Sequence, residues 1–216
     1  MPDDPDAAEG AAILAEVEAR RGYTLPYHRM FAAHAPRLLR DYDRFYDSLT
    51  LAPRVLTPRE RETVWAGLLA AAREVHGFIH MRRAVAAGLS NDDIARAVAI
   101  AAVTEGLGVI AFAGAHWPRW ALPEALRQRY LAAFDTVRGA LEPALAHLVA
   151  ATCQAARRHR QGTVLHLVEA CAAGATAPQI CEAFSYLLLP CGGNTLIEAV
   201  EYWEQGARDG LLPPPY

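Results

Sequence analysis

Residues 73–94 read REVHGFIHMRRAVAAGLSNDDI, and this stretch decides how the whole chain is interpreted. Its pattern predicts the end of one helix, a short turn at Gly77, a second helix that ends at Gly88, and a third helix directly after it. His76 and His80 lie four residues apart, a spacing that brings side chains together on one helical face. The stretch is therefore the first candidate for a functional site.

A second copy of this stretch lies 86 residues further along the chain. HMRRAVAAGLSNDDIARAV at 80–98 aligns with HLVEACAAGATAPQICEAF at 166–184. An alanine-rich composition does not easily imitate a series of matched histidines, glycines and tryptophans in the same order. The chain is therefore predicted to contain two tandem, pseudo-symmetric repeats. The matched pairs are His80 and His166, Gly88 and Gly174, Ile94 and Ile180, Gly106 and Gly192, and Trp117 and Trp203.

Helix signals run along the whole chain, and no convincing period-two strand pattern interrupts them. The clearest start signal is Thr57, followed by a proline and then by Glu60 three residues after the cap. The segment 94–103 is apolar nearly all round, so we expect it to be central and to end before the glycines Gly106 and Gly108. A second glycine pair at 192–193 predicts another break. The predicted fold class is all-α.

These boundaries divide the chain into four parts. Residues 1–25 are predicted to form an N-terminal tail and helix, 26–117 a first unit, 118–203 a second and degenerate unit, and 204–216 a C-terminal tail. The prolines at 118 and 123 mark the boundary between the two units. We expect the first residues of the acidic N-terminus, MPDDPDAAEG, to be disordered.

The composition limits the classes of partner. The 216 residues carry a formal net charge of -3 without a long run of one sign, which argues against nucleic acid and an anionic membrane as partners. No stretch of eighteen residues is free of polar breaks, so no membrane-spanning helix is expected. The N-terminus lacks the features of a signal peptide, which favours a cytoplasmic protein with reduced thiols. The four cysteines are interpreted as small, buried apolar residues.

The residues around the first histidine pair indicate acid–base chemistry. His80 and His76 are the candidate catalytic pair, because imidazole titrates near neutral pH, and Glu62 is the candidate to polarise a ring. A structural role for either histidine in an apolar helix is the plainer alternative. A guanidinium offers a planar fork of donors to a carboxylate. The candidate substrate-binding residues are therefore Arg73, Arg82 and the neighbouring Glu74.

The repeats are not chemically equal. In the place of Glu62 the second repeat has His147, and in the place of Arg82 it has Val168. Because the first repeat has more polar residues in this cluster, we predict the site there. The alternative is a single site that both units share across their interface.

A metal site is a weaker alternative reading of the same residues. His76 and His80 have the spacing of a ligand pair on a helix, and a carboxylate such as Glu62, Glu74 or Glu105 would complete a facial set. The HExxH form of such a pair is absent. We therefore interpret these residues first as a site without a metal.

Together these motifs resemble the carboxymuconolactone decarboxylase family, which includes the alkylhydroperoxidase D (AhpD) group. LTPRERETV at 56–64 and HGFIHMRRAVAAGLSNDDIARAV at 76–98 carry the resemblance. The family pattern of a histidine, an alanine four residues later and a glycine eight residues later is met by His80, Ala84 and Gly88. The resemblance covers both repeats. It implies an AhpD-like helical fold and a homotrimer that mimics the hexamers of single-unit members.

The chain departs from the peroxidase group at the positions of its thiols. That group has cysteines seven and four residues before the histidine, where this chain has Arg73 and His76. A thiol peroxidase needs a thiolate and a resolving cysteine, so we reject that activity. Arg73-Glu74, His80 and Arg82 are similar to the decarboxylase-like branch instead. The Tyr-x-Gly-x-Pro turn of that branch is replaced by Glu-Gly-Leu-Gly at 105–108.

The leading hypothesis is a cofactor-free lyase or isomerase that acts on a small carboxylated or lactone metabolite. His80 would be its general acid or base, aided by His76 and Glu62. A non-catalytic or ligand-binding family member is one alternative. A metal-dependent enzyme that uses His76 and His80 is another.

Overall fold

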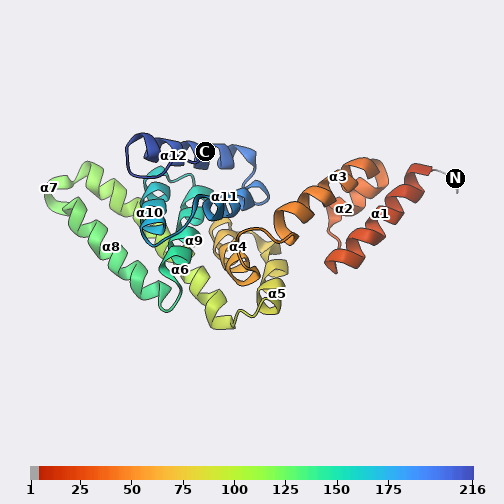
Figure 1. The fold of residues 1–216 in the computed structure, drawn as a ribbon, viewed down its shortest axis with the longest axis horizontal. Coiled ribbons are helices and arrows are strands. Elements are labelled where there is room, and N and C mark those ends of the chain that lie inside the picture. The colour runs from red at the N-terminus through yellow and green to blue at the C-terminus, as the bar shows by residue number, and fades with distance from the viewer. Residues whose placement is uncertain (1–4) are drawn as a thin grey trace. The chain divides into compact units, whose positions relative to one another are not determined.

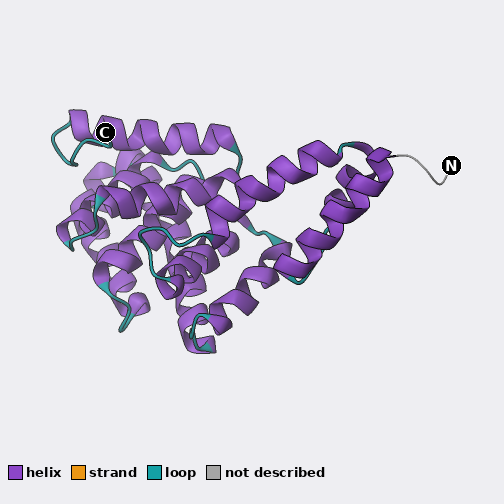
Figure 2. Cartoon of the chain, turned by 45° about the vertical axis from the view of Figure 1, so that its right-hand side comes forward, coloured by secondary structure: helices purple, strands orange, loops and turns teal. Residues whose placement is uncertain are grey.

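The structure, a computed structural model, describes residues 5–216, and this range is helical without a β-strand (Figure 2). The all-α fold class is confirmed. The disorder expected for the first residues concerns positions 1–4, which lie outside the described residues. The chain forms two compact units that meet in sequence at Ala52 and Pro53, and each is described by itself.

The N-terminal unit is a small helical bundle. Its elements are α1 (Pro5–Arg21), α2 (Pro26–His34), α3 (Pro36–Tyr46) and a π-helical turn, η1 (Asp47–Leu51). α1 packs against both α2 and α3. Proline at the first position of α2 and α3 suits a helix start, since its missing N–H has no partner there in any case. The buried apolar core is formed by Ile13, Val17, Ala32 and Leu39.

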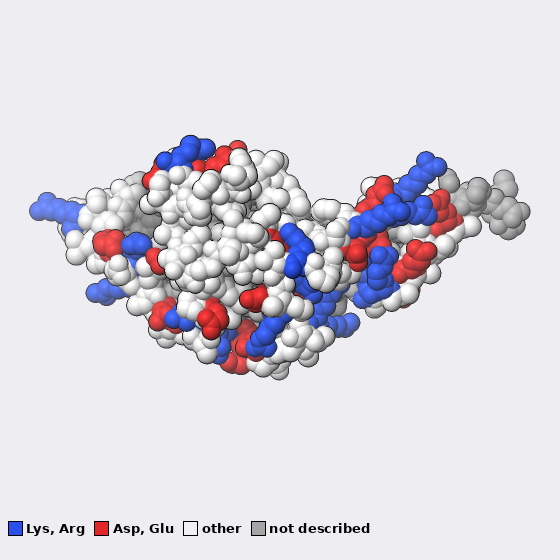
Figure 3. All heavy atoms as spheres, viewed as in Figure 1, with Lys and Arg blue, Asp and Glu red and all other residues white. Residues whose placement is uncertain are grey.

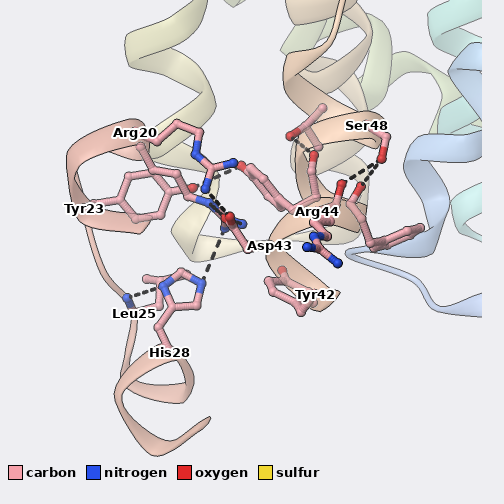
Figure 4. A network of polar contacts seen from close by, with 12 residues as sticks. Arg20, Tyr23, Leu25, His28, Tyr42, Asp43, Arg44 and Ser48 are labelled. Atoms are coloured by element: carbon pink, nitrogen blue, oxygen red, sulfur yellow. Dashed lines mark hydrogen bonds and ion pairs between the residues drawn. The ribbon is translucent and has the colours of Figure 1, made fainter. Parts of the chain in front are cut away.

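A polar network also joins the helices of this unit (Figure 4). The buried carboxylate of Asp43 in α3 accepts hydrogen bonds from Arg20 and Arg21 at the end of α1, with Arg21 Nε at 3.0 Å. The Arg21 guanidinium lies 3.8 Å from the centre of the Tyr46 ring. Nδ1 of the buried His28 accepts from the backbone N–H of Leu25 at 3.1 Å. The charge of Asp43 is thus balanced within the unit.

The second unit contains both copies of the quoted stretch (Figure 1). Its first helices are α4 (Pro58–Ala72), the 3-10 turn η2 (Val75–Gly77), α5 (Phe78–Ala86), α6 (Asn91–His116), α7 (Pro118–Ala121) and α8 (Pro123–Arg138). Its later helices are α9 (Pro143–Ala156), α10 (Arg160–Ala172), α11 (Ala177–Ser185), the 3-10 turn η3 (Tyr186–Leu188) and α12 (Gly193–Arg208).

The centre of the second unit is the crossing of α4 and α9, the equivalent helices of the two repeats. Val64 and Val149 are both fully buried there. A Cβ added to Gly67 would lie 2.4 Å from Val149 Cγ1, so glycine permits this close approach of the two helices. α6 packs against α4, α8 and α9, and α10 packs against α9 and α12. Both repeats therefore share one core.

The repeats are also recognisable in their backbone conformations. Arg73 directly follows α4, and Arg158 lies two residues after the end of α9. These two residues have nearly the same left-handed φ of 56° and 57°. Arg73 and Arg158 are 85 residues apart, whereas His80 and His166 are 86 apart. The second repeat therefore has one extra residue between the left-handed arginine and the histidine. The structural counterpart of Arg73 is Arg158, one residue earlier than the match to His159 in the sequence alignment.

The predicted helix start at Thr57 is confirmed, since Thr57 Oγ1 and Glu60 form a reciprocal capping box at the first turn of α4. The predicted break at Gly106 and Gly108 is wrong, because α6 continues through both glycines to His116. In the second repeat the chain does break, and Gly192 has a φ of +83°. Pro190 supplies the physical reason, because proline cannot continue a helix and the first repeat has Thr104 in its place.

α6 is central on one side only. It buries Ile100 and Leu107 but leaves Val98, Val109 and Phe112 at 42%, 71% and 52% exposure. By length and composition α6 would also be able to cross a membrane, with 33% of its most apolar window buried. By length and composition, α6 therefore departs from the expectation that no helix would be able to span a membrane. Core helices of soluble proteins pass the same test, so this feature is weak support for a membrane location.

Candidate active site

A buried carboxylate–imidazole pair lies in the first repeat. His80 Nδ1 is 3.0 Å from Glu62 Oε2, Glu62 is fully buried, and His80 is 7% exposed. The other carboxylate oxygen, Oε1, accepts from Arg61 Nε at 3.2 Å. Since a carboxylate only accepts hydrogen bonds, the imidazole proton lies on Nδ1 and the lone pair on Nε2. The pair is therefore arranged as an oriented base.

The two members of the pair come from neighbouring helices. Glu62 lies in the first half of α4, and His80 lies in α5 after the η2 turn. The left-handed residue Arg73 ends α4, and the Glu74 side chain caps η2 by accepting from the backbone N–H of His76 at 3.0 Å. This tight connection returns the chain so that α5 packs on α4. The quoted stretch thus sets the position of His80.

Burial controls the protonation of His80. Removal from water lowers the pKa of His80 below its usual value, while the hydrogen bond and charge of Glu62 oppose that shift. The resting imidazole is therefore neutral near pH 7. If it takes a proton on Nε2, the neighbouring Glu62 carboxylate stabilises the imidazolium.

Three rings are stacked beside this pair. The Trp65 ring lies 4.2 Å from the His80 ring at an interplanar angle of 25°, and 4.7 Å from the Tyr186 ring at 26°. The Tyr186 hydroxyl donates to Glu182 Oε1 at 2.6 Å. Glu182 Oε2 accepts from the backbone N–H groups of Val55 and Leu56 at 2.6 and 2.9 Å. The second repeat therefore helps to hold the site of the first.

Sequence reasoning did not identify Trp65, Tyr186 or Glu182 as site residues. Trp65 is noticed in the sequence only as an apolar residue of the helix that follows Thr57. The one signal is its position, three residues after Glu62, which places both side chains on the same face of α4. For Tyr186 and Glu182 no local signal exists, because their contacts reach back more than a hundred residues.

The second repeat has a different pair in the equivalent place. His147 Nδ1 lies 3.0 Å from His166 Nδ1, and the Tyr130 hydroxyl lies 2.6 Å from His166 Nε2. His166 is fully buried, and burial lowers its pKa well below the usual value. Burial also lowers the pKa of His147, to about 4. Both rings are therefore neutral, and one Nδ1–H donates to the other Nδ1.

The other predicted site residues lie on the surface. Arg73 pairs with Glu105 at 3.1 Å, and Arg82 lies 5.4 Å from the centre of the Phe78 ring. Both arginines are exposed. Of the six candidates, the structure therefore brings only Glu62 and His80 together at a buried position. The four that it places at exposed positions are Arg73, Glu74, His76 and Arg82.

His76 and His80 also do not share a helix or an environment. His76 belongs to η2 and is exposed, whereas His80 belongs to α5 and is buried. Among the described residues, no group of three or more His, Cys, Asp or Glu side chains is arranged to hold a metal ion. The alternative of a metal held by the two histidines therefore receives no support from the geometry.

Fold and site define a class of protein: an all-α tandem repeat with a buried carboxylate–histidine pair in its first half. A model of the carboxymuconolactone decarboxylase family matches the chain twice, at residues 36–118 and 122–205. The chain therefore belongs to the carboxymuconolactone decarboxylase family. The two matches follow one another along the chain, as expected for a tandem two-unit member. Neither the curated proteins nor the solved structures yield a match.

Proposed function

We propose that this protein is an acid–base lyase or isomerase that acts on a small carboxylated or lactone metabolite. The single observation that carries the proposal is the 3.0 Å contact between His80 Nδ1 and the buried Glu62 carboxylate. Such a contact fixes the tautomer and the direction of the imidazole, which is what a general base requires. Family membership supports the class of reaction.

The protonation state assigns an order to the steps. Neutral His80 first accepts a proton on Nε2, either from a carbon next to the substrate carbonyl or from solvent. The resulting imidazolium, paired with Glu62, then returns a proton to a carbanion or dienolate. Return to a different carbon gives isomerisation. If the carbanion arises by loss of CO2, the electrons of the broken C–C bond remain on the substrate, and the proton from Nε2 completes the lyase reaction.

The thiols support a reaction other than peroxide reduction. Burial raises the pKa of Cys153 to about 12, and it also raises the pKa values of Cys171 and Cys191. A thiol of raised pKa forms little of the nucleophilic thiolate. Of the four cysteines only Cys153 is buried, contrary to the expectation, while Cys171 and Cys191 are half-buried and Cys181 is exposed. No cysteine occupies the positions that precede His80 in a peroxidase.

The test is an assay of γ-carboxymuconolactone in D2O, with CO2 release and deuterium incorporation measured together. Proton removal by His80 incorporates deuterium even without net decarboxylation. The expected result is that His80→Gln loses both signals by a factor of roughly 100 or more, since general acid–base catalysis contributes that much. The exposed His116 gives a matched control, and His116→Gln should retain full activity.

Two outcomes of this assay count against the proposal. Equal signals from wild type and His80→Gln would show that His80 is not catalytic. Absence of both signals from wild type with this lactone and with related carboxylated lactones would favour the alternative of a non-catalytic or ligand-binding family member.

We also propose that the protein is a homotrimer, as the family resemblance implies. The exposed apolar side chains of α6 support an assembly that covers them, and Trp117 and Trp120 extend this surface at 54% and 77% exposure. On the face drawn in Figure 3, charged side chains are scattered and uncharged areas lie between them. Light scattering should give three chains for wild type and fewer for the double variant Val109→Glu, Phe112→Glu. Val85→Glu on α5 is the control, and a monomeric wild type contradicts the proposal.

A further inference from the structure

The indole N–H of Trp65 is the unexplained polar group of the active site. Trp65 is 1% exposed, and its Nε1 atom has no hydrogen-bond partner among the described residues. A buried donor without an acceptor loses the hydrogen bonds that it would make to water, so a native structure retains one only for a reason. Trp203 shows the ordinary arrangement, since its Nε1 donates to the backbone oxygen of Pro213 at 2.8 Å.

The Trp65 ring is held in one orientation from both sides. His80 covers one face and Tyr186 covers the other, both nearly parallel to the indole. Tyr186 is itself fixed, because its hydroxyl donates to the buried Glu182, whose other oxygen is held by two backbone N–H groups. With both faces covered, only the edge of the indole remains for a ligand, and Nε1 is the polar atom of that edge.

The neighbouring His80 gives the chemistry of the ligand. Glu62 accepts a hydrogen bond from the Nδ1–H group of His80, which leaves a lone pair on Nε2 for the reacting proton. Indole nitrogen only donates hydrogen bonds. A ligand that contacts both groups therefore has an acceptor oxygen for Trp65 and an exchangeable proton for His80. A carboxylate or lactone carbonyl next to an acidic carbon fits both requirements.

We propose that Trp65 Nε1–H donates a hydrogen bond to a carboxylate or carbonyl oxygen of the ligand that His80 deprotonates or protonates. This inference rests on the proposed function and names the group that binds the oxygen of its substrate. Glu62 is fully buried, whereas the His80 side chain is 8% exposed. The ligand therefore enters on the His80 side. Trp65 thereby takes the binding role that the exposed Arg73 and Arg82 do not fill in this structure.

The first test observes the indole signals of the 15N-labelled full chain by NMR. The chain has four tryptophans, and loss of one signal in Trp65→Phe identifies that of Trp65. If this variant does not fold, the Trp117→Phe, Trp120→Phe and Trp203→Phe variants identify it by elimination. The probes are γ-carboxymuconolactone and the stable dicarboxylate cis,cis-muconate. The chemical shift of the Trp65 indole N–H proton should move downfield on addition of a probe. The Trp203 indole N–H proton, which already donates to Pro213, should keep its chemical shift.

The second test measures binding of the same probes to Trp65→Phe, which keeps an aromatic ring between His80 and Tyr186 but lacks the N–H. A hydrogen bond to a charged group is worth enough to predict roughly 10-fold weaker binding or more. Trp203→Phe is the matched control, because it removes an indole N–H that has its acceptor outside the site, and it should bind the probes as wild type does.

The outcomes separate this inference from the proposed function. If the His80 ring signals respond to a probe while the Trp65 indole signal does not, a buried water or another group satisfies Nε1, and the inference about Trp65 is overturned. Unchanged binding by Trp65→Phe overturns it equally. If neither residue responds to either probe and no turnover is found, the proposed function fails, and the inference fails with it.

Discussion

His147 and His166 have their Nδ1 atoms 3.0 Å apart in the place where the first repeat has Glu62 and His80. Each repeat therefore has one histidine at this position, and its partner is a carboxylate in the first repeat and an imidazole in the second. A carboxylate opposes the effect of burial on the histidine pKa, whereas a second imidazole adds to it. The first repeat thus keeps a histidine that can accept a proton, and the second holds a neutral buried pair.

The variant His147→Glu should give the second repeat the chemistry of the first. A carboxylate close to His166 favours the imidazolium form, so the pKa of His166 should rise relative to wild type. NMR titration of the His166 ring measures this change. His147→Gln is the matched control, since it removes the second imidazole without adding a charge, and a rise of equal size in both variants would contradict the explanation by charge.

The reciprocal change Glu62→Gln should lower the pKa of His80. Glu62 raises this pKa through its hydrogen bond and its charge, and glutamine keeps an acceptor but removes the charge. NMR titration should show His80 ionising at lower pH than in wild type, and the activity proposed above should fall because the imidazolium is less stable. Arg61 loses its charged partner as well, so Arg61→Gln serves as the control for that effect. An unchanged or raised His80 pKa would count against the role given to Glu62.

Stability should decrease as the pH falls from about 6.5 towards 4. Burial lowers the pKa of His147 to about 4 in the folded state, whereas an unfolded histidine titrates near 6.5. Between these values the unfolded chain binds more protons, so the free energy of unfolding falls with decreasing pH and levels off below the folded pKa. The contribution of His147 is on the order of 3 kcal/mol.

Urea unfolding followed by tryptophan fluorescence measures this pH dependence. All four tryptophans lie after residue 53, so the signal reports the second unit. His147→Leu should show a shallower fall between pH 6.5 and 4, whereas His116→Gln should follow wild type. An equally steep fall in His147→Leu would show that other groups cause the pH dependence.

Removal of the Glu182 carboxylate should destabilise the second unit. Glu182 is 1% exposed and accepts from the N–H groups of Val55 and Leu56 and from the Tyr186 hydroxyl. Glu182→Ala leaves these donors without their acceptor, which should cost about 2–4 kcal/mol of unfolding free energy. Glu201→Ala, at an exposed position of α12, is the matched control and should change stability by less than about 0.5 kcal/mol. Equal stabilities would refute the bracing role of Glu182.

The all-α class and the tandem repeat are visible in the amino-acid sequence alone. Helix spacing, the cap at Thr57 and the paired histidines and glycines are local or periodic features, and such features can be read without knowing which helices meet. Family membership follows from the same motifs. The sequence also predicts that Glu62 polarises a histidine ring, because Glu62 and His80 belong to the matched pattern of one repeat.

The residues that surround that pair are known only from the tertiary structure. Glu182 and Tyr186 reach the first repeat from more than a hundred residues away, and Trp65 is stacked on Tyr186 only because the two repeats pack together. The tertiary structure also shows that His76 is exposed and that α6 continues through Gly106. Packing of α6 against neighbouring helices outweighs the modest local cost of a glycine in a helix. Burial and long-range contacts arise from packing, and no local pattern in the sequence records them.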